Sequence, residues 1–91
     1  MEFRISRHSG FAAPSDALDL LWQRLDANRG DVRFARYGAD ISATWGVDTP
    51  SSMERDDRDE LGRRAVLRIV CDVCDSAPEL KSDWFAVSAL R

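Results

Sequence analysis

The segment from Ser51 to Ser76 constrains the fold more than any other part of the chain, because its pattern is that of one long helix. Ser51 and Glu54 have the spacing of a capping box, in which the serine hydroxyl accepts from a backbone N–H and the glutamate reaches back. Pro78 cannot continue a helix and disfavours helical geometry in the residue before it. We therefore predict a helix over Ser51 to Ser76, with a start at Thr49-Pro50 as the alternative.

The second half of this helix carries an apolar arc that is much wider than the stripe of roughly 100° on an ordinary surface helix. The residues that fill the arc are Ala65, Val66, Leu67, Ile69, Val70, Cys71, Val73 and Cys74. Such a helix cannot leave most of its surface in water. We expect a sheet to cover one side of it and a second element to cover another.

Four other segments have the patterns of strands. Apolar and polar residues alternate over Glu2 to Arg7, Asp31 to Tyr37 and Ile41 to Val47, as in half-buried strands, and Gly38-Ala39-Asp40 predicts a hairpin turn between the last two. The segment from Ser82 to Leu90 predicts a strand that is apolar on both faces.

A second, shorter helix is predicted between the first two strands. Leu18, Leu21, Trp22 and Leu25 recur at the spacing of an amphipathic helix that begins near Pro14 or Ser15. Asn28-Arg29-Gly30 predicts its end, because glycine suits the left-handed position after a helix.

The predicted element order is β-α-β-β-α-β, which is the split-βαβ or ferredoxin-like arrangement. Right-handed crossovers would place both helices on one face of a four-stranded antiparallel sheet, with strand order 4-1-3-2. We therefore predict one α+β domain over residues 1–91. The residues expected to face the helices are Phe3, Ile5, Val32, Phe34, Ile41, Ala43, Trp45, Phe85 and Val87.

Composition excludes several classes of protein. With 44% apolar and 32% charged residues, the chain is that of a soluble globular protein, and no apolar run reaches the roughly 20 residues of a membrane span. Its first residues lack the apolar core of a signal peptide, so we expect a cytoplasmic location. Twelve of the thirteen basic residues are arginine, which is typical of a high-GC bacterial gene. The net charge of −3 argues against a general nucleic-acid binder.

The Cys71-Asp72-Val73-Cys74 motif is the only familiar pattern that could carry chemistry. A redox pair of this spacing works at a helix N-terminus, whereas these cysteines lie near a C-terminal end, where the dipole opposes a thiolate. A zinc site needs about four ligands, and His8 is the only histidine. We interpret Cys71 and Cys74 as buried thiols, with redox or zinc binding as the weaker alternatives.

The charged run from Met53 to Glu60 has two interpretations. It could bind a basic partner or a divalent cation, although it lacks the glycine and the ligand spacing of a calcium loop. The interleaved arginines favour a solvated helix start whose charges pair with one another. No nucleophile elbow or triad accompanies His8, and no cofactor motif is present, so we predict neither catalytic residues nor a cofactor.

The sheet face away from the helices is the predicted partner-binding surface. It would carry Arg4, Arg33, Tyr37 and Trp84, and these residue types dominate the hot spots of protein interfaces. We predict a non-catalytic module that binds a protein partner, or a second copy of itself, through this face or an open edge strand. The alternative is a nucleic-acid-binding regulator using the same face, although the clustered aromatics of an RNA-recognition sheet are missing.

Overall fold

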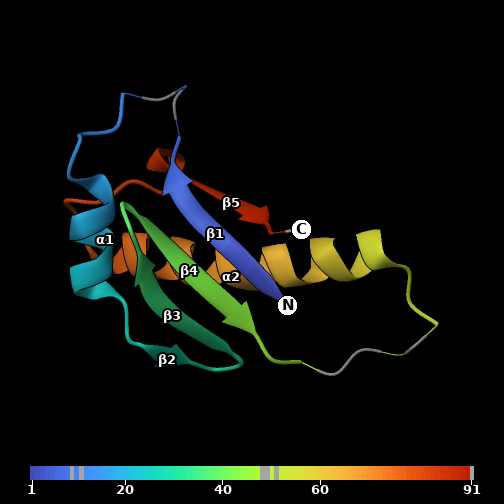
Figure 1. The fold of residues 1–91 in the computed structure, drawn as a ribbon. Helices are drawn as coiled ribbons and strands as arrows, with labels where there is room; N and C mark the ends of the chain where they lie inside the picture. The colour runs from blue at the N-terminus through green and yellow to red at the C-terminus, as the bar shows by residue number, and fades with distance from the viewer. Residues whose placement is uncertain (9, 11, 48–49, 51, 91) are drawn as a thin grey trace.

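The structure is a computed structural model that describes residues 1–8, 10, 12–47, 50 and 52–90 (Figure 1). It is an α+β protein with two α-helices and one antiparallel sheet, as predicted. Its elements, in order, are β1 (Glu2–Arg7), α1 (Ala17–Arg24), β2 (Asn28–Arg29), β3 (Val32–Tyr37), β4 (Asp40–Trp45), α2 (Arg55–Ser76), a short 3₁₀ helix (Ser82–Trp84) and β5 (Phe85–Ala89).

The sheet has five strands in the order β2-β3-β4-β1-β5, and every neighbouring pair is antiparallel. The four longer strands follow the predicted order. The prediction of a four-stranded sheet is wrong, because Asn28 and Arg29 form an additional edge strand that pairs with Arg33 and Val32. Gly30 has a φ of 60° in the turn between these strands. Its left-handed backbone therefore serves a hairpin and not the end of a helix.

Helix α1 is shorter than predicted. It begins at Ala17 and ends at Arg24, and Leu25 already has an extended backbone with a ψ of 133°. The Leu25 N–H donates to the carbonyls of Leu21 and Trp22, at 3.0 and 3.3 Å, so the last turn closes there. Leu21 is fully buried, which fixes the apolar side of α1 against the sheet.

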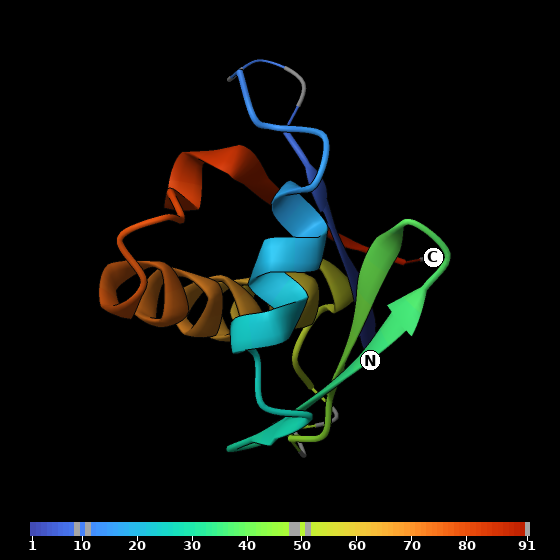
Figure 2. The ribbon, with the colours of Figure 1, turned by 90° about the vertical axis from the view of Figure 1, so that its left-hand side faces the viewer.

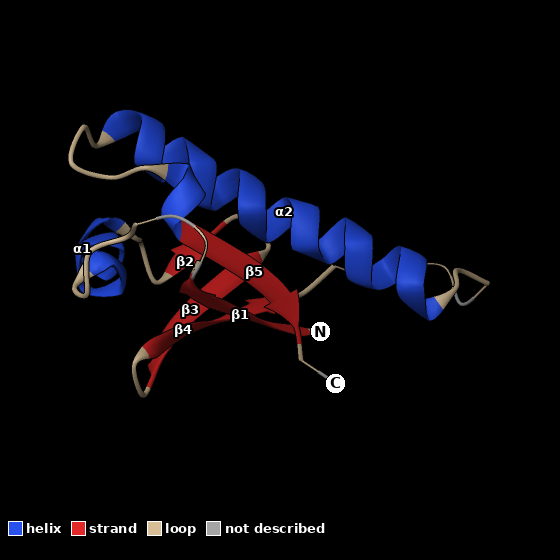
Figure 3. Ribbon diagram, turned by 90° about the horizontal axis from the view of Figure 1, so that it is seen from above, coloured by secondary structure: helices blue, strands red, loops and turns tan. Residues whose placement is uncertain are grey.

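Helix α2 begins at Arg55, four residues after the predicted start, and its N-cap is Glu54 without a side-chain hydrogen bond to the helix. The predicted capping box is therefore wrong for Glu54, which is itself the N-cap residue and not the third residue of the helix. The other predicted start residues, Ser51 and Thr49, lie outside the described residues. The helix ends at Ser76, as predicted. Figure 3 shows α2 running across the sheet, with its first turns extending past the strands.

The hydrophobic core is formed by buried residues of the sheet and of both helices. All nine strand residues predicted to face the helices are buried, and Phe3, Ile5 and Ile41 have no exposed surface. Buried residues of α1 and α2 belong to the same hydrophobic cluster. Figure 2 shows α1 at one end of the sheet, beside the C-terminal half of α2.

The wide apolar arc of α2 is only partly covered. Val66, Val70 and Val73 are buried against the sheet. Beyond the sheet, α1 and the 3₁₀ helix contact α2, and Leu80 folds back onto the core with 5% exposure. Leu67 packs at the margin of the core and is partly exposed. The second element predicted to cover the apolar arc of α2 is therefore supplied by α1, the 3₁₀ helix and Leu80 of the same chain.

The last strand begins later than predicted. The residues from Ser82 to Trp84 form a 3₁₀ turn, and the extended strand starts at Phe85. Within β5, Phe85 and Val87 face the core while Ser88 is exposed. The prediction of a strand apolar on both faces is wrong, because it counted Trp84 and Leu90, which lie on either side of the strand. No helix among the described residues has the length and apolarity that crossing a membrane requires.

Candidate functional site

The strand β5 is an edge of the sheet, and its backbone shows which groups are available there. The Leu90 N–H donates to the Glu2 carbonyl at 3.0 Å, and the His8 N–H donates to the Trp84 carbonyl at 2.7 Å. Because hydrogen-bonded pairs recur at every second residue of an antiparallel ladder, Ser88, opposite Arg4, also bonds to β1. The backbone groups of the alternate residues therefore point away from β1.

Three residues of β5 make up this outward set: Phe85, Val87 and Ala89. The Phe85 N–H closes the 3₁₀ turn by donating to the Ser82 carbonyl. The N–H groups of Val87 and Ala89, and the carbonyls of all three residues, face the open edge. No other strand of the described residues pairs with β5 on this side.

The side chains of the outward set point to the core, and its backbone groups have no strand partner among the described residues. Phe85 and Val87 are 4% and 9% exposed, whereas Ile5 and Ile41, on the central strands, are fully buried. Ala89 is more exposed than either of the other two. An extended chain would therefore gain access first at the C-terminal end of β5.

A groove runs beside this end of β5. It lies between β5 and the N-terminal half of α2, has a volume of about 490 Å³, and is lined by Asp56, Asp59, Glu60, Arg63 and Ala89. Strand β5 and helix α2 run in opposite directions (Figure 1), so the end of β5, with Ala89, lies beside the first half of α2. Helix α2 therefore lines the groove with charged side chains, next to the C-terminal end of β5.

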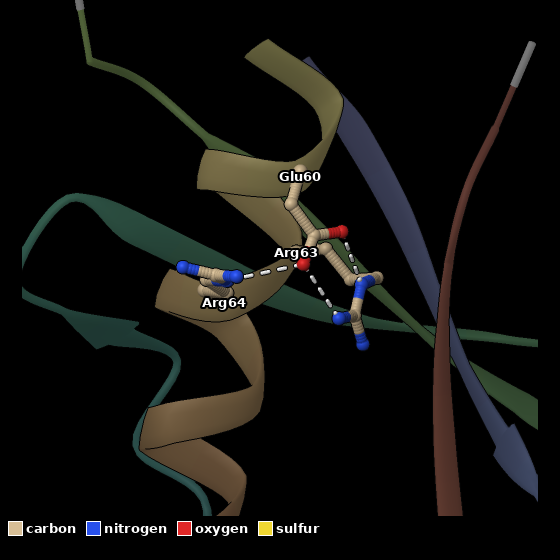
Figure 4. Close-up of polar contacts among 3 residues, drawn as sticks. All are labelled: Glu60, Arg63 and Arg64. Atoms are coloured by element: carbon tan, nitrogen blue, oxygen red, sulfur yellow. Dashed lines mark hydrogen bonds and ion pairs between the residues drawn. The ribbon is translucent and has the colours of Figure 1, made fainter. Parts of the chain in front are cut away.

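Two residues that line the groove, Glu60 and Arg63, belong to a cluster of three side chains that also includes Arg64 (Figure 4). Arg63 Nε and Nη2 donate to the two carboxylate oxygens of Glu60 at 3.0 and 2.8 Å, and Arg64 Nε donates to the same carboxylate at 3.0 Å. These hydrogen bonds from Arg63 and Arg64 lower the pKa of Glu60 from 4.5 to about 2. The bidentate pair holds Arg63 on the side of α2 that faces β5, while Arg64 points away.

The acidic start of α2 is thus partly self-paired. Glu60 pairs with arginines that follow it, and Arg58 Nη2 donates to the Met53 carbonyl at 3.3 Å. Among the described residues, no group of three or more histidine, cysteine or carboxylate side chains is arranged to hold a metal ion. Glu60 of the charged run therefore pairs with arginines beyond the run, and pairing among the charges within the run stays a prediction.

The outer face of the sheet brings together two of the four predicted partner-binding residues. The guanidinium of Arg4 lies 4.7 Å from the centre of the Tyr37 ring, a cation–π distance, and Arg4 Nε is 3.9 Å from Asp40 Oδ2. Arg33 is exposed on the same face of β3. Tyr37 is 61% exposed, so the pair offers an aromatic anchor, although Arg4 covers one face of the ring on which a base would stack.

Trp84 is not part of this surface. It belongs to the 3₁₀ turn, is half-buried and packs against the hydrophobic core. Its place is set by the register of β1 and β5, in which Arg7 pairs with Phe85, so Trp84 lies beyond the end of the ladder. Strand alternation, extended through the 3₁₀ turn, placed it on the wrong surface.

The two cysteines are free thiols at the end of α2. Cys74 is buried and Cys71 is partly exposed. Burial, followed by the nearby charges of Cys71 and Asp75, raises the pKa of the Cys74 thiol from 9.0 to about 11. A protonated buried thiol is a poor nucleophile and a poor zinc ligand. The prediction of a buried thiol is confirmed for Cys74, whereas Cys71 is only partly buried.

We expect alkylation to separate the two cysteines. At pH 8, iodoacetamide should modify Cys71 first in the folded protein, and modify Cys74 only on unfolding. The unfolded thiol ionises near pH 9 and the folded one near pH 11, so stability should fall as the pH rises between these values. Peptide mass spectrometry of the labelled protein, with a Cys71→Ser variant as control, would measure the labelling rates of the two thiols. Equal labelling rates would show that the last turn of α2 opens.

Sequence reasoning named the open edge strand but missed the groove beside it. Asp59 and Arg63 belong to the predicted helix, yet nothing in their spacing shows that they meet Ala89, which is distant in sequence. No protein-family model, no curated protein and no solved structure matches this chain. The function must therefore be inferred from the geometry alone.

Proposed function

We propose that this protein is a non-catalytic interaction module that receives an extended segment of a partner protein as an additional strand beside β5. The outward set of β5 carries the proposal, because its N–H and C=O groups have no strand partner among the described residues. Unpaired groups along an edge are a template for a further strand. Main-chain hydrogen bonds would supply affinity, as in other cases of strand addition.

The groove would supply specificity. Successive side chains of a strand alternate between its two faces, so every second side chain of the added segment would point to the side of the sheet that α2 covers. Near Ala89 such a side chain would enter the groove between β5 and α2, beside Arg63 and Glu60. Near Phe85 it would approach the apolar, C-terminal half of α2.

A partner segment fits this edge better than a second copy of the chain does. If two β5 strands paired, the side chains of Phe85 and Val87 in each copy would stay in their own core, where they are 4% and 9% exposed. A second copy would satisfy the backbone but have no side chain to place in the groove. A free extended segment can do both.

We also infer that the architecture is a ferredoxin-like arrangement with both helices on one face of the sheet and β2 as an addition. The order of the four longer strands and the single cluster formed by α1, α2 and one set of strand residues support this inference. In such a fold the other face stays free. The Arg4–Tyr37 pair on that face would be a second contact surface for a large partner.

The proposal can be tested with peptides selected from a random display library on the intact protein. Ala89→Pro removes one outward N–H and leaves the bonds to β1 in place, whereas Ala89→Val keeps that N–H. We expect the selected peptides to bind about two- to tenfold more weakly to Ala89→Pro, the effect of one hydrogen bond, and to bind Ala89→Val with little change. Fluorescence anisotropy would measure the affinities.

Hydrogen exchange gives a second, direct measurement. Binding should protect the Val87 and Ala89 amides, which have no strand partner on the edge. If no peptide is enriched, or if bound peptides leave both amides unprotected, strand addition at β5 is wrong. A solution mass of twice the monomer, lost in Ala89→Pro, would show that the occupant is a second copy and not a partner.

A further inference from the structure

The groove beside the end of β5 carries an excess of negative charge. Its lining includes three carboxylates, those of Asp56, Asp59 and Glu60, and one guanidinium, that of Arg63, which gives a balance of −2. Arg64 pairs with Glu60 from outside the groove, and counting it as well leaves a balance of −1. A side chain that enters the groove therefore meets net negative charge in either case.

Burial strengthens the effect of this charge. Asp59 is 9% exposed and is the only buried charged residue in the part of the chain that the structure describes. Charges attract one another more strongly in a partly buried site than in bulk water. Hydrogen bonds from Arg63 and Arg64 lower the pKa of Glu60 to about 2, so its carboxylate is also charged at neutral pH. The groove therefore favours a cationic side chain over a neutral or an anionic one.

One turn further along α2, the same side of the helix is apolar. Leu67 follows Arg63 by four residues, the spacing at which side chains lie one above the other on a helix. It packs at the margin of the core and is partly exposed. Four residues advance a helix by about 6 Å, and two residues advance a strand by about 6.6 Å. Because α2 and β5 run in opposite directions (Figure 1), the turn that carries Leu67 is expected beside Val87.

We propose that the partner segment pairs antiparallel with β5 and carries a lysine or arginine opposite Ala89 and an apolar residue opposite Val87. This inference rests on the proposed function, because it names the chemistry of the segment that β5 receives. Residues directly opposite each other in an antiparallel pair point to the same face of the sheet, so both side chains turn toward α2, as Ala89 and Val87 do. The cation meets the carboxylates of the groove, and the apolar side chain covers Leu67.

The direction of the segment follows from the pairing. Every neighbouring pair in the sheet is antiparallel, and antiparallel pairing is slightly more stable per residue than parallel pairing. In an antiparallel segment the residue opposite Ala89 comes before the residue opposite Val87. The pattern from the N-terminus to the C-terminus is therefore a basic residue, any residue and an apolar residue.

Four short peptides with blocked ends test this pattern. TKSVTLS, TQSVTLS and TESVTLS differ in one residue, and SLTVSKT is the first sequence reversed. NMR titration of the intact protein at millimolar peptide concentration would follow the Val87 and Ala89 amides. We expect TKSVTLS to bind about two- to tenfold more tightly than TQSVTLS, and TESVTLS and SLTVSKT to bind more weakly than TKSVTLS. Added salt should reduce the preference for lysine.

Variants of α2 assign the preference to the groove. Asp56→Asn and Asp59→Asn each remove one negative charge from the lining, and the ratio of the TKSVTLS and TQSVTLS affinities should fall about twofold or more in each. The matched control is Asp72→Asn, which removes the same charge from an exposed position on α2 outside the groove and should leave the ratio unchanged. Asp56 is exposed, so its variant remains a test even if Asp59→Asn does not fold.

The outcomes separate this inference from the proposed function. If the lysine, glutamine and glutamate peptides shift the Val87 and Ala89 amides equally, strand addition stands and the basic requirement is wrong. An equal loss of preference in Asp72→Asn would also contradict it, because the net charge of −3 would then act as a whole. Equal binding of SLTVSKT would contradict the direction. If neither these peptides nor the library-selected ones shift the two amides, both proposals are wrong.

Discussion

Replacing Gly62 by alanine is expected to destabilise the protein by about 1–3 kcal/mol, the usual cost of an overpacked core. A Cβ at this position would lie 2.5 Å from Cζ of Phe3 and 2.7 Å from Cε3 of Trp45. Both rings are buried where α2 crosses β1 and β4, with 0% and 6% exposure. Neither ring can yield without moving other core side chains, because protein interiors are close-packed.

The direction of this effect opposes helix propensity. Alanine in place of glycine inside a helix gains roughly 1 kcal/mol from propensity alone. A matched control is Asp72→Ala, an exposed position on the same helix, which should be neutral or slightly stabilising. Urea unfolding of both variants would measure the difference. If Gly62→Ala is as stable as the unaltered protein, α2 does not approach the sheet as closely as the structure shows.

A double variant tests whether the Phe3 ring is the cause. Phe3→Leu removes the ring atoms that an alanine at position 62 would meet, and by itself it should destabilise the protein by leaving a space. We expect Gly62→Ala to cost less in the Phe3→Leu background, with a coupling of about 0.5–3 kcal/mol, since the two residues are in contact. Additive effects would assign the cost to the Trp45 ring, which the added Cβ would also meet.

The sequence predicted the interior of the sheet better than the ends of the helices. Alternation in β1, β3 and β4 is a local property, and every strand residue expected inside is buried. The close approach at Gly62 depends on which turn of α2 crosses Phe3, and no local pattern encodes a crossing point. The start of α2 was misplaced because a serine and a glutamate three residues apart fit a capping box that the chain does not complete.

The candidate sites also divide into features that a local sequence pattern predicts and features that depend on packing. An exposed edge could be predicted because the strand order 4-1-3-2 places the last strand at an edge of the sheet. The groove beside Ala89 could not, since Arg63 enters it only through the packing of α2. Trp84 was misassigned because a 3₁₀ turn interrupts the alternation at that residue. Arg4 and Tyr37 were placed on one face, but their contact spans β4 and needs the register of three strands.

The register itself gives the second large expected effect. Replacing Ile41 by alanine should cost about 2–5 kcal/mol, the range for deleting a buried branched side chain. Ile41 pairs with Ile5 across β4 and β1 and has no exposed surface. Its neighbour Ser42 points to the outer face, where its hydroxyl donates to Glu2 Oε1 at 3.0 Å. Replacing Ser42 by alanine should cost no more than about 1 kcal/mol, the usual net value of a hydrogen bond.

The contrast between these neighbours is a test of the whole sheet, because a slip of one residue would exchange the two faces of β4. Chemical denaturation of Ile41→Ala and Ser42→Ala would measure the contrast, and similar losses of stability in both variants would contradict the register.

The proposed function depends on the same register. Odd-numbered residues of β1 bond to β4, as the Trp45 N–H to Met1 carbonyl bond of 2.8 Å shows, so even-numbered residues bond to β5. The outward set of β5 exists only if that alternation holds.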